Sequence, residues 1–237
     1  MLILGITTST VQVACAIGGH EGVLASVQSA RGKRHAESLA PSIDFLRRQA
    51  RVGLDDLGCV AVDVGPGLFT GLRVGIATAK AIAHALRVPM VGVSSLDLVA
   101  FPLRWSPRLV VAALDARRGE VFSASYRQVP AGIQRLGDSK VRSPDDLVSE
   151  LFAVGDDVLL VGDGALRHRD IFADLEGVEI ADQGLAYPSA ASLVQLAHAQ
   201  ALREEFVQPS ELEPLYLRRP DAEVNWSLRD AAQRSPA

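Results

Sequence analysis

The stretch DVGPGLFTGLRVGIATAKAIAHAL, residues 63–86, joins a glycine- and proline-containing turn to a long run of small and apolar residues. Small residues recur at every fourth position within it, at Gly67, Gly71, Gly75, Ala79 and Ala83. Positions four apart lie on one face of an α-helix, so the spacing predicts a helix with a bare face. Each interior glycine costs a helix roughly 1 kcal/mol relative to alanine, and the close approach of another backbone would offset that cost.

Two interpretations of the bare face remain open. It could receive a helix of another chain, or it could pack within its own domain against residues 36–50, whose apolar positions also repeat at helical spacing. Phosphate-binding motifs do not fit the stretch. A Walker loop requires a lysine where Leu72 stands, and a dinucleotide fingerprint requires a glycine where Thr70 stands. The amides that begin the helix could still attract an anion.

The composition is typical of a soluble globular protein. The chain has 237 residues, of which 48% are hydrophobic and 22% charged, and its formal net charge is −4. That charge argues against a generally basic nucleic-acid-binding surface and leaves a local basic patch open. Cys15 and Cys59 lie in apolar runs and are expected to be buried thiols. The sequence has no apolar run long enough for a membrane span and no secretory signal, so we expect a cytoplasmic protein.

The strand pattern occurs twice along the chain. Residues 1–30 read as three successive strands, and residues 109–129 again read as strand, polar turn and strand. The apolar run that ends at Leu114 and Asp115 matches the run that ends at Ile6 and Thr7. We therefore predict two related α/β lobes with mixed sheets covered by helices. The expected boundaries are 1–104 for the first lobe, 105–218 for a smaller second lobe, and 219–237 for a polar, loosely ordered tail.

Two polar segments are candidates for chemistry. Asp115, Arg117, Arg118 and Glu120 cluster in one turn, either as surface ion pairs or as a charged patch that faces a cleft or partner. Residues 161–165, VGDGA, could approach a nucleotide closely or could form a plain strand-to-helix turn. The five histidines show no convincing zinc spacing, and the serines lack a nucleophile elbow.

Four segments together resemble the TsaB (YeaZ) family: residues 65–83, residues 31–50, residues 115–126 and residues 214–222. They cover nearly the whole chain in the expected order, with Leu68 where the family usually has serine. The resemblance implies a two-lobed actin-like fold of the sugar kinase and heat-shock ATPase type. It also implies a role in making threonylcarbamoyladenosine in tRNAs that read codons beginning with A. In that role the chain would be the non-catalytic partner of the TsaD transferase, joined by the TsaE ATPase.

The same resemblance bears on catalysis. Relatives of the TsaD type hold a metal with two histidines four apart, and here Ser95 and Val99 occupy those positions. Actin-like ATPases place a carboxylate at the end of the first strand, where this chain has Thr7. We therefore expect no tightly bound cofactor or metal, and ATP or ADP only in the assembled complex. The candidate residues of a nucleotide site or cleft are Thr7, Thr8, Asp115, Arg117, Gly162 and Gly164.

The resemblance further implies that the helix after residue 67 and the helix of residues 36–50 meet TsaD, and that the lone protein self-associates as a homodimer through the same surface. The expected interface residues are Gly67, Gly71, Leu72, Gly75, Ala79, Ala83, Leu39, Ile43 and Leu46. On this hypothesis Gly71→Leu or Gly75→Leu weakens the heterodimer and leaves the monomer folded. The most basic segment, Arg31, Lys33, Arg34, Arg47, Arg48 and Arg51, is either a solvated helix face or a tRNA contact.

Other function classes remain as alternatives to a scaffold. The chain could be a stand-alone ATP-dependent kinase or a metallopeptidase of the actin-like superfamily, or a dimeric binding module for a nucleotide. A kinase should keep the carboxylate at the position of Thr7, and a peptidase should keep the histidine pair.

Overall fold

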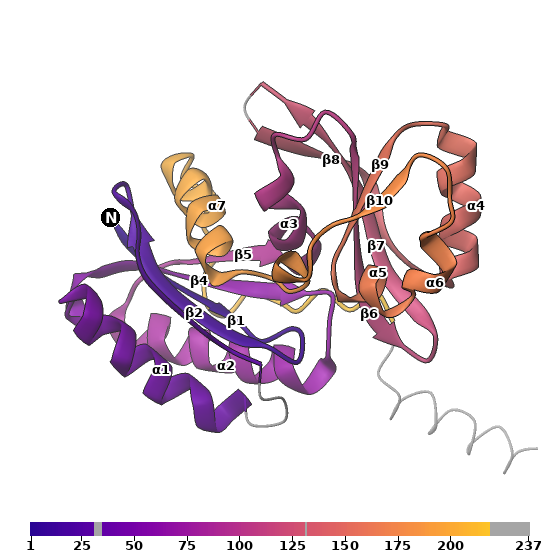
Figure 1. The fold of residues 1–237 in the computed structure, drawn as a ribbon. Coiled ribbons are helices and arrows are strands. Elements are labelled where there is room, and N and C mark those ends of the chain that lie inside the picture. Colours follow the sequence, from indigo (N-terminus) through magenta and orange to yellow (C-terminus); the bar gives the residue numbers. More distant parts are fainter. Residues whose placement is uncertain (31–34, 131, 219–237) are drawn as a thin grey trace, which may run out of the picture.

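The computed structural model describes residues 1–30, 35–130 and 132–218, which form two five-stranded sheets with helices around them (Figure 1). The first sheet has the order β3-β2-β1-β4-β5 and consists of β1 (Leu2–Thr7), β2 (Val13–Gly19), β3 (Gly22–Ser29), β4 (Leu57–Gly65) and β5 (Met90–Ser94). Its first three strands are antiparallel, whereas β4 pairs parallel with both β1 and β5.

The second sheet repeats this topology. It consists of β6 (Leu109–Arg117), β7 (Glu120–Val129), β8 (Gly132–Arg142), β9 (Val158–Val161) and β10 (Val178–Ile180). The strand order is β10-β9-β6-β7-β8, with an antiparallel meander of β6, β7 and β8 and parallel pairs from β6 to β9 to β10. The predicted relation between the two halves is confirmed, and the fold is the two-lobed actin-like α/β arrangement.

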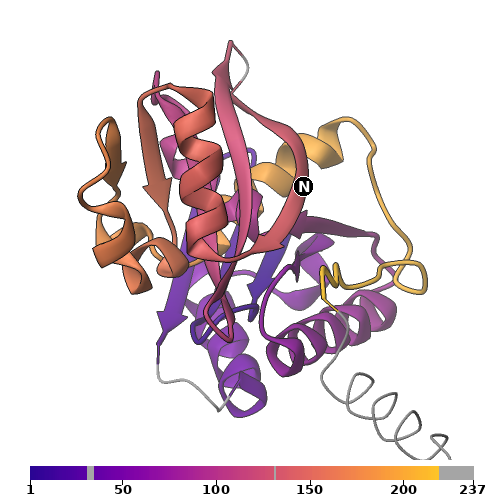
Figure 2. The same ribbon diagram turned by 90° about the vertical axis from the view of Figure 1, so that its right-hand side faces the viewer.

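Helices cover both faces of the first sheet (Figures 1 and 2). On one face lie α1 (His35–Ala50) and α2 (Phe69–Leu86), and on the other lie α7 (Ala190–Leu202) and the short α3 (Ser95–Ala100). The outer face of the second sheet packs against α4 (Pro144–Val154), α5 (Asp163–Arg167) and α6 (Arg169–Phe172). Short 3-10 turns complete the chain: η1 (Leu54–Asp56), η2 (Phe101–Leu103) and η3 (Gln183–Leu185). No helix in these described parts is long and apolar enough to cross a membrane.

Burial on both faces explains the apolar character of the central strands. In β1, Leu4 packs toward α1 and α2, whereas its neighbour Ile3 packs toward α7. A strand buried on both sides reads as a continuous apolar run rather than as an alternating one. Cys15 and Cys59 are buried free thiols in this sheet, as the sequence predicts.

The end of the chain differs from the predicted lobe boundary. The apolar face of α7, with Leu193 and Ala197 fully buried, covers β1 and β2 of the first sheet. Val207 then pairs with Met90 of β5, and the Leu215 N–H donates to the carbonyl of Val64 over 2.7 Å. Residues 190–215 therefore return to the first lobe, because the face of its sheet opposite α1 and α2 needs an apolar cover. The predicted tail, 219–237, lies outside the described residues.

The bare face of α2 packs inside its own lobe. A Cβ atom on Gly71 would lie 2.1 Å from the Thr8 carbonyl oxygen, and one on Gly75 would lie 2.2 Å from the Thr8 hydroxyl oxygen. The turn between β1 and β2 therefore rests on these two glycines, while Ala79 and Ala83 are fully buried under the sheet. The interpretation of packing within one domain is correct, with the sheet and this turn as the main partners.

This packing corrects the expected partner surface. The buried positions are Gly71, Leu72, Gly75, Ala79 and Ala83 of α2 and Leu39, Ile43 and Leu46 of α1. The prediction that they form the partner interface is wrong, because all of them are buried, and Leu39, Ile43, Leu46, Ala79 and Ala83 belong to the core between the two helices and the sheet. Gly67 is half-buried, and its Cα faces the Ser9 carbonyl so closely that a Cβ would lie 2.2 Å from that oxygen.

Candidate functional site

A buried carboxylate joins the ends of the central strands in the first lobe. Asp63, 1% exposed near the end of β4, accepts hydrogen bonds from the hydroxyls of Thr7 (2.7 Å), Ser9 (2.5 Å) and Ser95 (2.5 Å), and from the Gly65 N–H (2.9 Å). Burial raises the pKa of Asp63, and the four hydrogen bonds oppose that rise. Because both carboxylate oxygens are occupied, Asp63 holds these elements together and faces no open space.

The two threonines expected at the cleft instead point into the first lobe. Thr7 donates to Asp63, and Thr8 donates to the Gly71 carbonyl over 2.7 Å; both are almost fully buried. Their assignment as cleft residues is therefore wrong. Sequence reasoning missed Asp63, although an acid near the end of the apolar run GCVAVDVG, residues 58–65, was a usable signal.

Ser95 and Val99, which stand where TsaD-type relatives have metal-binding histidines, are both buried in this structure. Ser95 is fully buried and bonded to Asp63, and Val99 packs in the apolar core beneath the second sheet. Neither side chain is available to a ligand. The described residues contain no group of three or more His, Cys, Asp or Glu side chains placed to hold a metal ion.

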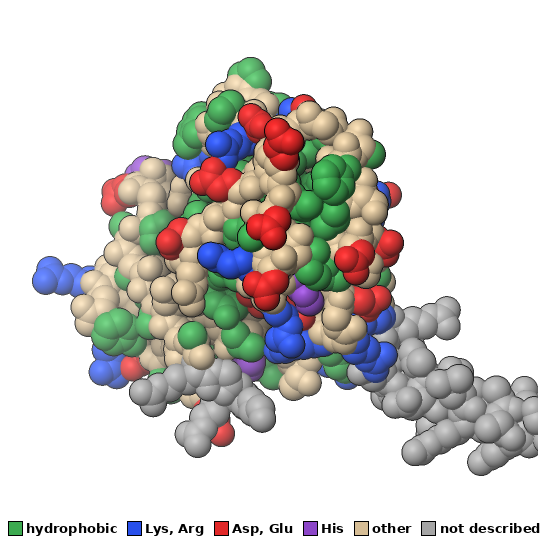
Figure 3. All heavy atoms as spheres, turned by 45° about the vertical axis from the view of Figure 1, so that its right-hand side comes forward, with side chains coloured by type: hydrophobic (Ala, Val, Ile, Leu, Met, Phe, Trp, Pro, Cys, Tyr) green, Lys and Arg blue, Asp and Glu red, His purple; other side chains and the backbone are tan. Residues whose placement is uncertain are grey.

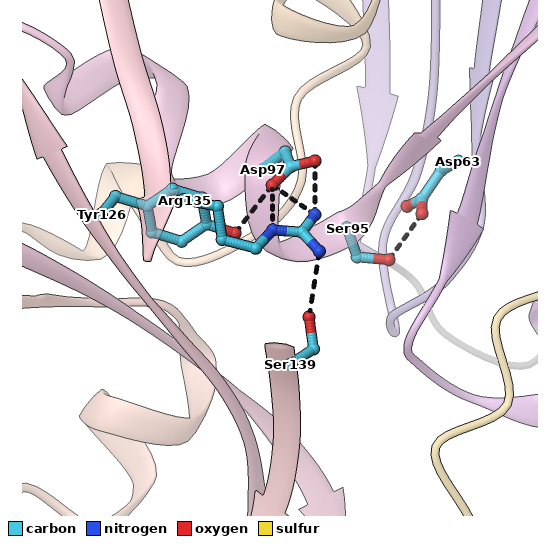
Figure 4. Close-up of polar contacts among 6 residues, drawn as sticks. All are labelled: Asp63, Ser95, Asp97, Tyr126, Arg135 and Ser139. Atoms are coloured by element: carbon cyan, nitrogen blue, oxygen red, sulfur yellow. Dashed lines mark hydrogen bonds and ion pairs between the residues drawn. The ribbon is translucent and has the colours of Figure 1, made fainter. Parts of the chain in front are cut away.

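Helix α3 links the two lobes through polar contacts of its first and third residues, Ser95 and Asp97, as Figure 4 shows. Ser95 points to Asp63 in the first lobe, while Asp97 points to the second sheet. Asp97 accepts hydrogen bonds from the Tyr126 hydroxyl (2.8 Å) and from Nε (3.0 Å) and Nη2 (2.6 Å) of Arg135. Burial and the adjacent Asp97 raise the pKa of Tyr126, so its hydroxyl stays a donor. The lobes are thereby held in one orientation.

The turn between β6 and β7 carries the charged groups of the second lobe. The Asp115 carboxylate pairs with Arg117 (3.1 Å) and Arg167 (3.4 Å), and its own N–H donates to Asp163 Oδ1 over 3.0 Å. Burial raises the pKa of Asp163 to about 6, and the hydrogen bond from Asp115 N–H limits the rise. Asp115 and Arg117 line the inner cleft between the lobes and form an ion pair with each other, so features of both alternatives for this turn are present.

The inner cleft between the lobes is almost closed. Its free volume is about 10 Å³, and its lining includes Ser9, Leu68, Asp115 and Asp163. One water molecule needs about this much space, so a phosphate group does not fit. The lobes approach each other here through the β1–β2 turn and the β6–β7 turn, which are the places where a cleft was expected.

The two glycines of the VGDGA segment face their own sheet. A Cβ on Gly162 would lie 2.2 Å from the Ala113 carbonyl oxygen, and one on Gly164 would lie 2.8 Å from the Leu114 carbonyl carbon. Close approach was the correct reason for these glycines, but the approaching group is strand β6. Their assignment to an open nucleotide site is therefore wrong, and the plain strand-to-helix turn is correct.

An open cavity of about 380 Å³ lies beside the closed cleft. It is lined by the segment that leads into α2 (67–70), the end of β6 with the turn after it (115–118), Phe122 of β7, and the returning chain (215–218). We call it the arginine cavity, because Arg117, Arg118 and Arg218 line it with a single carboxylate, that of Asp115.

Aromatic groups stand at the rim of the arginine cavity. The Arg73 guanidinium lies 3.8 Å from the centre of the Phe69 ring, and its Nε donates to the Tyr216 hydroxyl over 3.3 Å. The Phe69 and Tyr216 rings lie 5.3 Å apart. Arg218 is anchored by Glu120 over 2.5 Å and by the Ala116 carbonyl. Sequence reasoning assigned no role to these side chains, because they meet only when the returning chain reaches α2.

The basic segment that was considered for tRNA is only partly described. Arg47 and Arg48 both pair with Asp44 on α1, over 2.7 and 2.5 Å. These pairs fit the solvated helix face better than a free basic patch. Residues 31–34 lie outside the described residues.

Comparisons with known proteins agree with this architecture. The family model described as "TsaD: tRNA N6-adenosine threonylcarbamoyltransferase" matches residues 22–226. The chain is 36% identical to an uncharacterized protein of Mycobacterium leprae over 93% of its own length, and spans 56% of that relative. It is 28% identical to the tRNA threonylcarbamoyladenosine biosynthesis protein TsaB of Bacillus subtilis, over 95% of this chain and 98% of that protein. A solved structure from Pseudomonas aeruginosa, described as similar to the peptidase YeaZ, matches with a TM-score of 0.81 and 27% identity over 92% and 99% of the two chains.

The duplicated sheets and the cleft between them define a two-lobed protein of the actin-like class. Within that class, the chain belongs to the tRNA N6-adenosine threonylcarbamoyltransferase family, in its TsaB (YeaZ) branch.

Proposed function

We propose that the chain is a cytoplasmic, non-catalytic subunit of the assembly that forms threonylcarbamoyladenosine in tRNAs reading codons that begin with A. Relatives named TsaB support the pathway. The observation that carries the non-catalytic role is the closed inner cleft of about 10 Å³. A subunit of this shape acts by supporting a TsaD-type transferase, with a TsaE-type ATPase in the same assembly, and meets tRNA through the complex.

The residues at the sites of the competing functions support this proposal. A kinase of this class needs a carboxylate at the end of the first strand, where this chain has Thr7, which is bonded to Asp63 in the interior. The Asp115 carboxylate does line the cleft, but it is paired with Arg117 and Arg167. A metallopeptidase needs ligands at Ser95 and Val99, which are both buried. Nucleotide binding in the inner cleft belongs in this proposal only to the assembled complex, because in the lone chain that cleft has no room for a phosphate.

The partner surface of this proposal is the outward face of α2. Arg73, Ala77, Ala81 and Ala85 stand four apart and are all exposed. Because the three alanines lie on one face of the helix, another helix can approach that face closely. The sequence analysis expected this role of the glycine face, which is buried. On neighbouring α1 the Phe45 side chain is 51% exposed and offers apolar area. The same surface would serve TsaD in the complex and a second copy in the lone protein.

Reconstitution tests the function. The purified chain alone and then with its TsaD- and TsaE-type partners is assayed for threonylcarbamoyladenosine in a tRNA transcript. We expect product only from the complete set, and turnover by the lone chain would overturn the proposal.

A matched pair of variants tests the surface. Ala81→Trp should abolish co-elution with the TsaD-type partner in size-exclusion chromatography, because the new ring keeps the partner helix away. Ala153→Trp, at an exposed alanine of α4 in the other lobe, should co-elute like the parent. Co-elution of Ala81→Trp at the parent's level would contradict the assignment.

A further inference from the structure

The arginine cavity concentrates positive charge in a chain whose net charge is −4. Arg117, Arg118 and Arg218 line it, and Arg167 lies beside them. Asp115 pairs with Arg117 and Arg167, and Glu120 pairs with Arg218, so these four guanidinium groups exceed the two carboxylates. Figure 3 shows the same contrast on the surface: Lys and Arg side chains gather at the base of the second lobe, whereas Asp and Glu side chains dominate higher on that face. Such a patch attracts polyanions despite the acidic whole.

The backbone at two of these arginines has an unfavourable conformation. Arg117 and Arg118 have φ angles of 63° and 56°, in the left-handed region. That region costs a non-glycine residue roughly 1–2 kcal/mol, and hairpin turns of this kind normally use Asn or Gly. Two consecutive arginines at these positions therefore point to a function that needs their guanidinium groups.

The rim adds stacking surfaces to the charges. Tyr216 is 39% exposed, and the Arg73 guanidinium lies over the Phe69 ring. Proteins that bind RNA strands combine guanidinium groups on the phosphates with aromatic or guanidinium planes against the bases. A cavity of about 380 Å³ can take one nucleotide unit of a strand that continues along the open rim.

We propose that the arginine cavity binds the phosphate backbone of an RNA strand, with Arg117 and Arg118 on the phosphates and Tyr216 against a base. The inference rests on the proposed function, in which tRNA is the substrate of the assembly. A free nucleotide also carries phosphates. It would fill the cavity without reaching Arg73 and Arg167, which lie outside the cavity lining, whereas a longer strand can contact them. The experiment below separates the two sources of phosphate.

The test measures binding of a fluorescein-labelled tRNA transcript to the lone, full-length chain by anisotropy. Arg117→Gln/Arg118→Gln removes two charges and keeps a Cβ at both left-handed positions, so the fold is retained. Losing two phosphate contacts should weaken binding at least about tenfold and reduce the slope of log K against log salt by about 1.4. The matched control Arg47→Gln/Arg48→Gln removes two charges from α1 and should bind like the parent.

Several outcomes would overturn the inference. The first is a parent protein that fails to bind tRNA at about 50 mM salt, and the second is a control that loses as much affinity as Arg117→Gln/Arg118→Gln. Displacement of the tRNA by millimolar ATP would assign the cavity to a free nucleotide instead. Unchanged binding by Arg117→Gln/Arg118→Gln, in an assembly that still modifies tRNA, would refute this inference alone. If the parent and both variants bind tRNA as expected but the complete assembly forms no threonylcarbamoyladenosine, the proposed function alone is refuted.

Discussion

At the scale of single residues, buried acids decide how the lobes are built. The carboxylate of Asp63 is the shared acceptor of three hydroxyl donors and one N–H, which come from β1, the turn after it, β4 and α3. These hydrogen bonds occupy both carboxylate oxygens, so Asp63 has a structural role in the first lobe.

Removing the shared acceptor should be costly. Asp63→Ala leaves three buried hydroxyls and an N–H without their partner, and each such group costs about 1–3 kcal/mol, so we expect a loss of about 4 kcal/mol or more. Asp63→Asn keeps one carbonyl oxygen and the shape, and should lose about half as much. Urea unfolding followed by circular dichroism measures both. A loss below about 1 kcal/mol for Asp63→Ala would contradict the structural role.

Asp163 should make stability depend on pH. Its pKa in the folded chain is raised from 3.8 to about 6, so the folded state holds the proton more tightly than the unfolded state. That contribution is complete below the unfolded pKa and is lost as the pH rises through about 6. Asp163→Asn keeps the acceptor for Asp115 N–H and does not titrate. Between these pH values the parent should lose about 3 kcal/mol relative to the variant. Parallel stability curves would show that Asp163 does not titrate as described.

At the scale of elements, helical periodicity identified α2 and its small-residue face but not what covers that face. The covering group, Thr8, lies 63 residues before Gly71 in the chain and makes its contact only after β1 and β4 have paired. Local spacing therefore predicts a face without its partner. The segments that were predicted correctly, such as the first three strands and the strand, turn and strand of residues 109–129, depend on local signals.

The packing of α2 can be tested on one helix. Gly71→Ala puts a Cβ 2.1 Å from a backbone oxygen, which cannot move without shifting β1, so we expect a loss of about 3 kcal/mol in the free energy of unfolding. Ala77→Leu, on the exposed side of the same helix, should change that free energy by less than about 0.5 kcal/mol. Thermal and urea unfolding of the isolated monomer provide the comparison. Equal stability of the two variants would mean that the glycine face is not packed as described.

At the scale of the whole molecule, the repeated strand order was visible in the sequence because each lobe begins with the same strand, turn and strand. The return of residues 190–215 to the first lobe was not, since apolar spacing in α7 does not say which sheet it covers. The site divides in the same way. Asp115 and Arg117 line the inner cleft, as one of the two alternatives for their turn predicted, whereas the partners Tyr216 and Arg218 join them only through that return.

The orientation of the lobes should depend on the contact between α3 and the second sheet. Arg135 donates to Asp97 through Nε and Nη2, and both side chains are about 30% exposed, so the pair is only partly screened by solvent. A double-mutant cycle with Asp97→Asn and Arg135→Gln should give a coupling energy of about 1–2 kcal/mol. Amide hydrogen exchange should rise in α3 and β8 of each variant before it rises in β1 and β4, because the loss is confined to the junction. A coupling energy near zero, or exchange that increases equally through both sheets, would show that the lobes are held together by their apolar contacts alone.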